Sequence, residues 1–430
     1  MRILCVSPCY PPQANSESFC TGKMISALRD CGAEVLVLYM DSPDLCDHRD
    51  HSALWSKASE NSFAVGHVAK SRRVTAAFLG LQYQTAAWAR WIGDVVSSCL
   101  ELNRRQPFDL IYSRSPTLCG HLAGYWLARR LKLPWIANLN DPWDWHLFPG
   151  RAPQHVSAGY ATISNFWLRR TLRTANIVTY PCNRLAAYMG RLSGVDRKNE
   201  IIPHVGAASS DNVIQDEFRL VHAGKLGSNE ITGRSTIALL KALRSFLDKT
   251  PAAVPITRFV LVGKEDPQTN AIVAELGLKA IVVNAGEVSY EESLKHMALA
   301  SVCILIEGKM EEGVYLPSKV ADYLTARKPV LALSPAKGTI ADMVSSGGVI
   351  RVDQQDEQEI EKAISRLYTA YIQGLLLNFA PSDRVVDQFS AKVISNQFLQ
   401  LVSQLTPNTK AAGHAAKVGY GLPETELAAR

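Results

Sequence analysis

Residues 302–333 alternate between apolar and polar segments in a pattern that constrains the fold of the whole chain. Val302–Ile306 is an apolar, largely β-branched run of the length of a buried strand, and another apolar run begins at Val330. Between them lie a polar loop and a segment with helical spacing, which begins after Pro317, where a missing N–H costs nothing. Strand, loop, helix and strand in this order predict a doubly wound α/β domain with a parallel sheet.

The start of this expected helix carries charges suited to an anionic ligand. Lys319 lies in its first turn, Glu311 and Glu312 precede it, and Asp322 follows one turn later. The free N–H groups of a helix N-terminus and a cation suit a diphosphate, whereas a carboxylate can accept hydrogen bonds from sugar or ribose hydroxyls. An ordinary βαβ unit with a solvated charged loop is the alternative.

The segment GVYLPSKVADYLTARKPVLA resembles the donor site of GT-B glycosyltransferases of family 4 type, in the branch that reads P-S-K-x-x-E-Y-x-x-x-G-K-P-V. Three positions depart from that pattern. The family's two glutamates fall at Val314 and Asp322, and its glycine falls at Arg327. Glu312 lies two residues from the missing glutamate and is the candidate to replace it. The resemblance implies donor contacts from Glu312, Gly313, Ser318, Lys319 and Asp322.

A glycine turn opens the second half of the chain. Gly224 and Gly227 follow an apolar strand, and Lys225 and Arg234 bracket the turn ahead of a helix expected near Ser235. Two cations at a helix N-terminus suit a pyrophosphate. The segment is similar to the family's G-x-L/Y…G-R-S motif, which implies catalytic roles for Lys225 and Arg234. The Gly-Glu-Val turn further on resembles the family's base-binding loop and adds Glu287 and Val288 as donor contacts.

The first half has a similar pattern of strands and helices. Strand residues 3–7 precede a Cys-Tyr-Pro-Pro turn, and no G-x-G-x-x-G follows, which disfavours a dinucleotide-binding dehydrogenase. The opening ILCVSPCYPP resembles the family's, which implies acceptor contacts from Ser16 and Glu17. The strand PWIANL ends at Asn140-Asp141-Pro142-Trp143, where relatives carry R-D-P-W. Because ligands bind beyond strand C-termini, Asp141 is a catalytic candidate and Trp143 an acceptor-side one.

The expected architecture is α/β: a GT-B chain of two facing, doubly wound Rossmann-like domains with a C-terminal helix crossing back. Residues 41–74 have no clear period and are expected to form an excursion. The expected parts are an acceptor-side domain at 1–205, a linker at 206–217, a nucleotide-sugar-binding domain at 218–383, a crossover helix at 384–405 and a disordered tail at 406–430.

Composition narrows the function classes further. Nine cysteines without CxxC or Cys/His ligand spacing indicate free thiols rather than disulfides or zinc. Asp-Pro-Trp-Asp is not the Asp-x-Asp of metal-dependent transferases, so neither a metal nor a cofactor is expected. The chain has no apolar run of roughly 18 residues, and its first residues form a strand rather than a cleavable signal. A cytoplasmic protein is expected.

The resemblance implies a retaining, metal-independent hexosyltransferase that moves a sugar from a nucleoside-diphosphate sugar to a polysaccharide repeat unit or lipid-linked glycan. A sugar-nucleotide epimerase on the same fold is one alternative. A catalytically lapsed glycan-binding protein is another, because of the departures at Asn140, Val314, Asp322 and Arg327.

Positive charge gathers in the first half of the chain. Residues 1–205 hold 23 Lys and Arg against 15 Asp and Glu, a net of +8, and the remainder holds 23 against 25, a net of −2. No nucleic-acid-reading motif accompanies the charge. We expect peripheral attraction to an anionic membrane surface at the cytoplasmic face. The arginines lie at 72–73, 104–105, 129–130 and 169–173, with help expected from Tyr83, Trp88 and Trp91. The helix that carries these aromatic residues also suits a plain core position, which the base rate for amphipathic helices favours. A merely solvated basic face is the alternative to membrane attraction.

Overall fold

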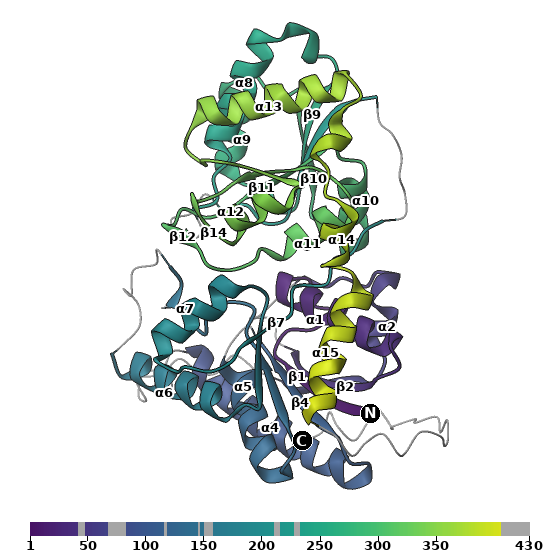
Figure 1. The fold of residues 1–430 in the computed structure, drawn as a ribbon, viewed down its shortest axis with the longest axis vertical. Helices are drawn as coiled ribbons and strands as arrows, with labels where there is room; N and C mark the ends of the chain where they lie inside the picture. The colour runs from purple at the N-terminus through teal and green to yellow at the C-terminus, as the bar shows by residue number, and fades with distance from the viewer. Residues whose placement is uncertain are drawn as a thin grey trace. The chain divides into compact units, whose positions relative to one another are not determined.

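The computed structural model describes residues 1–41, 48–67, 83–115, 118–144, 147–149, 158–209, 216–227 and 233–405. The chain divides into two compact units (Figure 1). The first contains Met1–Leu147, Ala152–Ile202 and Ser395–Arg430, and the second contains Phe148–Arg151 and Pro203–Ile394. The expected tail at 406–430 lies outside the described residues.

The first unit contains a seven-stranded parallel sheet in the order β3-β2-β1-β4-β5-β6-β7. Its strands are β1 (Arg2–Ser7), β2 (Glu34–Asp41), β3 (Ser62–His67), β4 (Leu110–Arg114), β5 (Trp135–Asn138), β6 (Ile177–Tyr180) and β7 (Glu200–Ile201). Its helices include α1 (Ser16–Asp30), α2 (Ser56–Ser59), α4 (Tyr83–Arg105), α5 (Leu118–Leu131), α6 (Ala158–Thr174) and α7 (Asn183–Ser193). The central strands are buried, as expected for a parallel sheet covered on both faces.

Strand β3 corrects the expectation that residues 41–74 form an excursion without regular structure. It adds to the edge of the sheet beside β2, with Ser62 opposite Val37. An edge strand pairs on one side only, so its sequence, SFAVGH, needs no continuous apolar run. The alternation of apolar and polar residues that predicts a strand is therefore weak in this segment.

The second unit repeats this topology. Its six parallel strands, in the order β10-β9-β8-β11-β13-β15, are β8 (Phe218–Ala223), β9 (Thr257–Val262), β10 (Val282–Gly286), β11 (Val302–Ile306), β13 (Val330–Leu333) and β15 (Val349–Val352). The helices that follow these strands are α8 (Ile237–Lys249), α9 (Pro267–Glu275), α10 (Tyr290–Ala298), α11 (Ser318–Thr325), α12 (Thr339–Met343) and α13 (Glu357–Ile372). A separate pair of two-residue strands joins β12 (Glu312–Gly313) to β14 (Lys337–Gly338).

An apolar core holds the helices α8 and α13 against this second sheet (Figure 1). The Tyr368 ring lies 5.3 Å from the Phe246 ring and 5.5 Å from the Phe218 ring, centroid to centroid, both in edge-on geometry. Aromatic rings favour this arrangement because the positive edge of one meets the negative face of the next. These ring contacts fix α8 and α13 against the start of β8.

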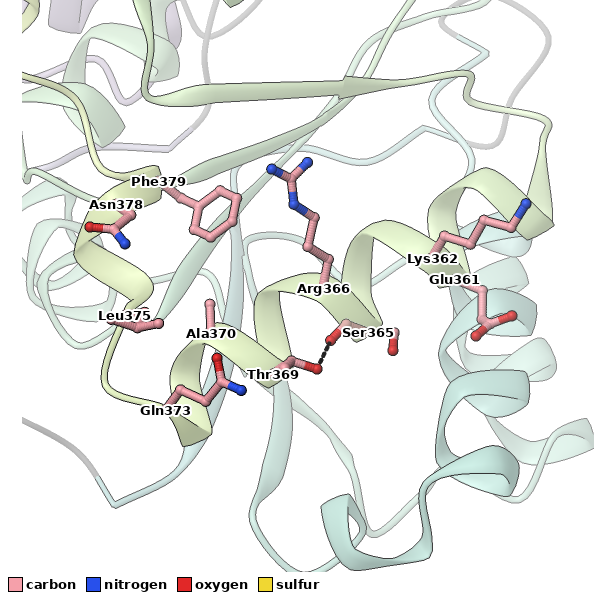
Figure 2. A pocket seen from close by; sticks show the side chains of 10 residues that line it. All are labelled: Glu361, Lys362, Ser365, Arg366, Thr369, Ala370, Gln373, Leu375, Asn378 and Phe379. Atoms are coloured by element: carbon pink, nitrogen blue, oxygen red, sulfur yellow. Dashed lines mark hydrogen bonds between the residues drawn. The ribbon is translucent and has the colours of Figure 1, made fainter.

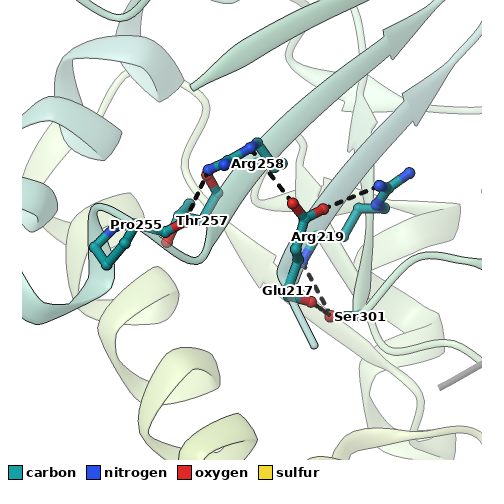
Figure 3. Close-up of polar contacts among 6 residues, drawn as sticks. All are labelled: Glu217, Arg219, Pro255, Thr257, Arg258 and Ser301. Carbon is teal, nitrogen blue, oxygen red and sulfur yellow. Dashed lines mark hydrogen bonds and ion pairs between the residues drawn. The ribbon is translucent and has the colours of Figure 1, made fainter. Parts of the chain in front are cut away.

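Polar contacts fix the amino ends of β8, β9 and β11 (Figure 3). The Glu217 carboxylate pairs with Arg219 at 3.0 Å and with Arg258 at 3.5 Å. The Ser301 hydroxyl accepts from the Arg219 N–H at 3.0 Å and donates to the Glu217 carbonyl at 3.1 Å. Two cations of the second unit thus share one carboxylate at the edge opposite the carboxyl ends of the strands.

The C-terminal segment forms two helices instead of the single helix expected at 384–405. These are α14 (Asp383–Asp387) and α15 (Ala391–Leu405). Ser390 starts the second helix, because its hydroxyl accepts from the Val393 N–H at 3.3 Å, as an N-cap does. From Ser395 onward the helix belongs to the first unit, where the Phe398 ring lies 4.7 Å from that of Tyr112. The chain therefore returns to its first unit.

Two further expectations concern the described residues only. The eight cysteines found there are free thiols. None of the helices seen in the described ranges is long and apolar enough to cross a membrane.

Candidate functional site

The centre of the second sheet has the geometry of a ligand site. Strands β8 and β11 are neighbours there, and the strand order reverses between them. Loops leave the carboxyl ends of two such strands toward opposite sides, so an open crevice forms at this point in doubly wound sheets. Gly224 directly follows β8 and Glu307 directly follows β11.

Lys319, in the first turn of α11, directs a buried ammonium group to this point. Its Nζ has no hydrogen-bond partner among the described residues. A Cβ placed on Gly224, which has φ +115°, would lie 2.7 Å from this Nζ. Burial, with a smaller effect of Arg234, lowers the pKa of the ammonium to about 7. A buried charge without a partner is costly, which makes this a place for an anion.

Arg234 provides a second cation at the same place. A short antiparallel bridge holds its backbone, with the Arg234 N–H donating to the Gly227 carbonyl at 3.1 Å. Its charge contributes to the lowered pKa of both Lys319 and His222, a buried residue of β8. Lys225 is exposed beside Gly224, and the helix expected near Ser235 begins at Ile237. Two of the three predicted cations, Lys319 and Arg234, therefore act on one another.

Glu307 is a site residue that the sequence reasoning missed. Both of its carboxylate oxygens are buried, with only a weak hydrogen-bonding contact to Ser334. A Cβ on Gly313 would lie 3.3 Å from its Oε1. Burial raises the pKa of this carboxyl to about 7, against the lowering effects of Ser334 and Arg234. An acidic residue directly after a fully apolar strand is a sequence signal that could have identified it.

The predicted donor contacts differ in their exposure. Ser318, the first residue of α11, is half-buried, and Glu312 and Gly313 form β12. Glu287 is exposed and Val288 half-buried in the turn between β10 and α10. These residues come from the loops that leave the carboxyl ends of β10 and β11.

Asp322 has a structural partner. It is buried, and its Oδ1 accepts a hydrogen bond from the Ala207 N–H at 2.9 Å. The carboxylate therefore holds the backbone just after Gly206. No sequence pattern indicates this contact, because the partner is a backbone group 115 residues away.

A second polar cluster occupies the equivalent point of the first unit. The Asn140 amide donates to the Glu17 carboxylate at 2.8 Å, and Asp141 shares a hydrogen bond with the same group. Burial raises the pKa of Glu17, whereas Asn140, the Arg114 charge and Asp141 each lower it. Arg114 is itself buried and donates to the Thr21 hydroxyl at 3.1 Å. Glu17 and Asp141, predicted independently, thus meet in one place.

Trp143 follows Asp141 by two residues and is buried, so it packs inside the unit instead of lining an open cleft. Its ring stacks on that of His121, with centroids 5.3 Å apart. The His121 Nδ1 pairs with the Ser113 hydroxyl at 3.0 Å, and burial lowers the pKa of this imidazole to about 3. Ser16 is exposed at the start of α1.

An open groove of about 690 Å³ lies elsewhere on the second unit, between α13 and the turn Leu376–Phe379 (Figure 2). The Arg366 guanidinium lies 4.8 Å from the centroid of the Phe379 ring. The groove contains none of the residues predicted for the site. The described residues include no cluster of His, Cys, Asp and Glu that could hold a metal ion.

Two doubly wound parallel sheets in one chain, with a returning C-terminal helix, define the GT-B fold. Residues 18–204 match the glycosyl transferase 4-like domain. The protein is a GT-B chain that resembles glycosyltransferases of family 4. No curated protein matches the sequence.

Solved structures share this fold at low sequence identity. The sucrose-phosphate synthase of Thermosynechococcus elongatus is 16% identical, with a TM-score of 0.67 over 94% of this chain and 99% of that one. HepE of Anabaena in complex with UDP and glucose is 16% identical, with a TM-score of 0.65 over 94% and 100%. A putative UDP-N-acetylglucosamine 2-epimerase from Listeria monocytogenes is 10% identical, with a TM-score of 0.56 over 94% and 96%.

Proposed function

We propose that the protein is a hexosyltransferase that moves a sugar from a nucleoside-diphosphate sugar to a glycan or lipid-linked acceptor. The observation that carries this proposal is the buried, unpartnered ammonium of Lys319 above Gly224, with Arg234 close enough to perturb it. A donor diphosphate would supply the negative charge that this place lacks. The similarity to HepE, whose structure contains UDP and glucose, supports the same donor class.

The chemistry requires stabilisation of a leaving diphosphate while positive charge develops on the sugar. Cations and helix N–H groups that are fixed in advance stabilise such a leaving group strongly in a water-poor site. Lys319, Arg234 and the start of α11 would meet this need without a metal. The Glu307 carboxylate would accept hydrogen bonds from hydroxyls of the donor sugar. We propose that transfer proceeds with retention of configuration.

The acceptor would bind to the first unit. Glu17 and Asp141 form a hydrogen-bonded carboxyl pair at the carboxyl ends of its central strands. A pair of this kind can accept hydrogen bonds from a sugar hydroxyl and take up its proton. Trp143, two residues after Asp141, would help to hold this loop through its stacking on His121.

A thermal-shift screen against UDP, GDP, ADP and their sugar conjugates tests the donor class. A ligand at 100 times its dissociation constant adds about 2.7 kcal/mol of stability, which is readily detected. We expect one nucleotide to stabilise the protein and Arg234→Ala to abolish that effect. Turnover should fall at least 100-fold in Lys225→Ala or Arg234→Ala, about 2.7 kcal/mol of transition-state stabilisation. Unchanged turnover in both variants would refute the assignment.

A sugar-nucleotide epimerase is the second candidate, because the Listeria structure shares the fold. Product analysis separates the two reactions. Transfer consumes one donor for each glycosidic bond formed. An epimerase instead isomerises the nucleotide sugar, or frees its nucleoside diphosphate, without glycan growth. Nucleotide-sugar binding with no turnover on any acceptor would instead indicate a glycan-binding protein.

A further inference from the structure

Helices α5 and α6 are neighbours in the first unit (Figure 1). Together they expose aromatic and aliphatic side chains. The exposed fractions are 42% for Trp126, 51% for Ile163 and 56% for Phe166. The exposed arginines of the same helices are Arg129, Arg130, Arg169, Arg170 and Arg173. We call these eight residues the α5–α6 surface.

The α5–α6 surface is ordered by its own contacts. The buried Tyr125 ring lies 5.3 Å from the Trp126 ring and 5.5 Å from that of Trp167. The guanidinium groups of Arg129 and Arg170 lie 5.7 and 5.5 Å from the Tyr125 centroid. Arg170 Nε also donates to the Tyr125 hydroxyl at 3.1 Å. These cation–π contacts hold exposed arginines beside exposed aromatic rings.

The charge of this surface is of one sign. Helix α5 has 14 residues and α6 has 17, and together they carry five arginines and no Asp or Glu. Asp144, a carboxylate that α6 does contact, accepts from Tyr160 at 2.7 Å and from Ser164 at 2.8 Å. A second copy of the chain would bring arginines against arginines in a two-fold interface. A partner of this surface would therefore carry negative charge.

We propose that the α5–α6 surface docks the protein on a bilayer of anionic phospholipid. Tryptophan and phenylalanine suit the boundary between headgroups and acyl chains, and arginines on the same face meet the lipid phosphates. Each basic residue near an anionic surface strengthens binding by about fivefold. Trp91, expected earlier to contribute, is only 1% exposed and belongs to the core, and the side chains of Tyr83 and Trp88 lie outside the described residues.

Vesicle cosedimentation tests the role of the arginines. The full chain should pellet at low salt with vesicles of phosphatidylcholine and phosphatidylglycerol, and remain in the supernatant with phosphatidylcholine alone. The double variant Arg130→Ala/Arg173→Ala should bind the anionic vesicles roughly 25-fold more weakly. The matched control is Lys57→Ala/Arg244→Ala, which removes the same charge from cations paired with Asp30 and Asp248. This control should weaken binding much less.

A second pair of variants tests the apolar contact. Phe166→Ser should weaken vesicle binding, whereas Leu377→Ser, at a residue 81% exposed in the second unit, should not. Brominated acyl chains should quench wild-type tryptophan fluorescence more than that of Trp126→Phe. These readouts need neither donor nor acceptor, so they are independent of the proposed transferase activity.

Two outcomes would overturn the proposal. One is equal recovery of the arginine variant and its control with anionic vesicles. The other is a dimer that forms without vesicles and dissociates in Phe166→Ser, which would make the surface a protein interface.

Discussion

The ammonium of Lys319 occupies the space that a side chain at Gly224 would need, because a Cβ there would lie 2.7 Å from its Nζ. The lysine can reach this position only because residue 224 is glycine. Gly224 also has φ +115°, which side-chain-bearing residues rarely adopt. One residue thus fixes both the shape of the turn after β8 and the place of the cation.

Gly224→Ala should displace this ammonium and weaken nucleotide binding by at least tenfold. The added methyl group both strains the backbone and takes the space of the Nζ. Gly277→Ala is the matched control, since Gly277 has φ +65° and nothing within 4 Å of its Cβ position. It also places a side chain at a positive φ, with less strain than at +115°, and leaves Lys319 in place. Calorimetric titration of the nucleotide measures the difference, and equal affinity in the two variants would contradict it.

Glu307 should make folding stability depend on pH in a defined window. Burial raises its pKa from the ordinary 4.5 to about 7, so the folded state binds more protons than the unfolded state between these values. The free energy of unfolding should therefore fall as pH rises from 4.5 to about 7, by at most about 3 kcal/mol. Glu307→Gln should lose this decline. Urea unfolding at pH 4.5 and at pH 7 measures the change in the free energy of unfolding. An equal change in the wild type and in Glu307→Gln would contradict the prediction.

The sequence predicts the site best where local pattern determines structure. The strand at 302–306 and the helix after Pro317 appear as predicted, because an apolar run and a helical period leave few alternatives. The prediction of Lys319 as a site residue rests on its place in the first turn of that helix. Arg327, where relatives have glycine, keeps the left-handed backbone of that position at φ +59°. A helix end can thus survive the substitution, at a cost of about 1 kcal/mol.

Long-range contacts set the limit of such prediction. Whether Asp322 faces a ligand or the Ala207 N–H depends on a loop far away in the chain. The burial of Glu307 depends likewise on how Gly313 packs against it. Neither contact leaves a periodic signal. The spacing of Trp91 fits either a core or an interfacial helix, and packing places it in the core, which the base rate already favoured.

Asp322→Ala should destabilise the second unit by about 1–3 kcal/mol, because the Ala207 N–H loses its charged acceptor. Asp322→Asn retains an acceptor oxygen and should cost less. Asp383→Ala, which removes an exposed ion pair with Arg327, is the control and should change stability by less than about 1 kcal/mol. Thermal unfolding measures all three. If Asp322→Ala is fully stable but binds the donor more weakly, the ribose contact expected from the sequence is correct instead.

The carboxyl pair of the first unit leads to the last prediction. A glutamine at position 17 can accept from the Asn140 amide and donate to Asp141, so Glu17→Gln should preserve the hydrogen bonds and the fold. It cannot ionise, however, and so cannot take up a proton from an acceptor hydroxyl. Turnover should fall about 100-fold or more. Nucleotide affinity should stay unchanged, because the proposed donor residues belong to the second unit.

The control for this prediction is Glu101→Gln, at an exposed glutamate of α4 that pairs with Arg105, which should retain turnover. Steady-state kinetics with saturating donor and varied acceptor separates the two variants, and calorimetry checks the nucleotide. Full turnover in Glu17→Gln would mean that the pair only holds α1 against the loop after β5. A loss of nucleotide affinity would instead mean that the two units do not divide donor and acceptor as proposed. Glu17→Gln therefore tests both the uptake of the acceptor's proton and the assignment of donor and acceptor to different units.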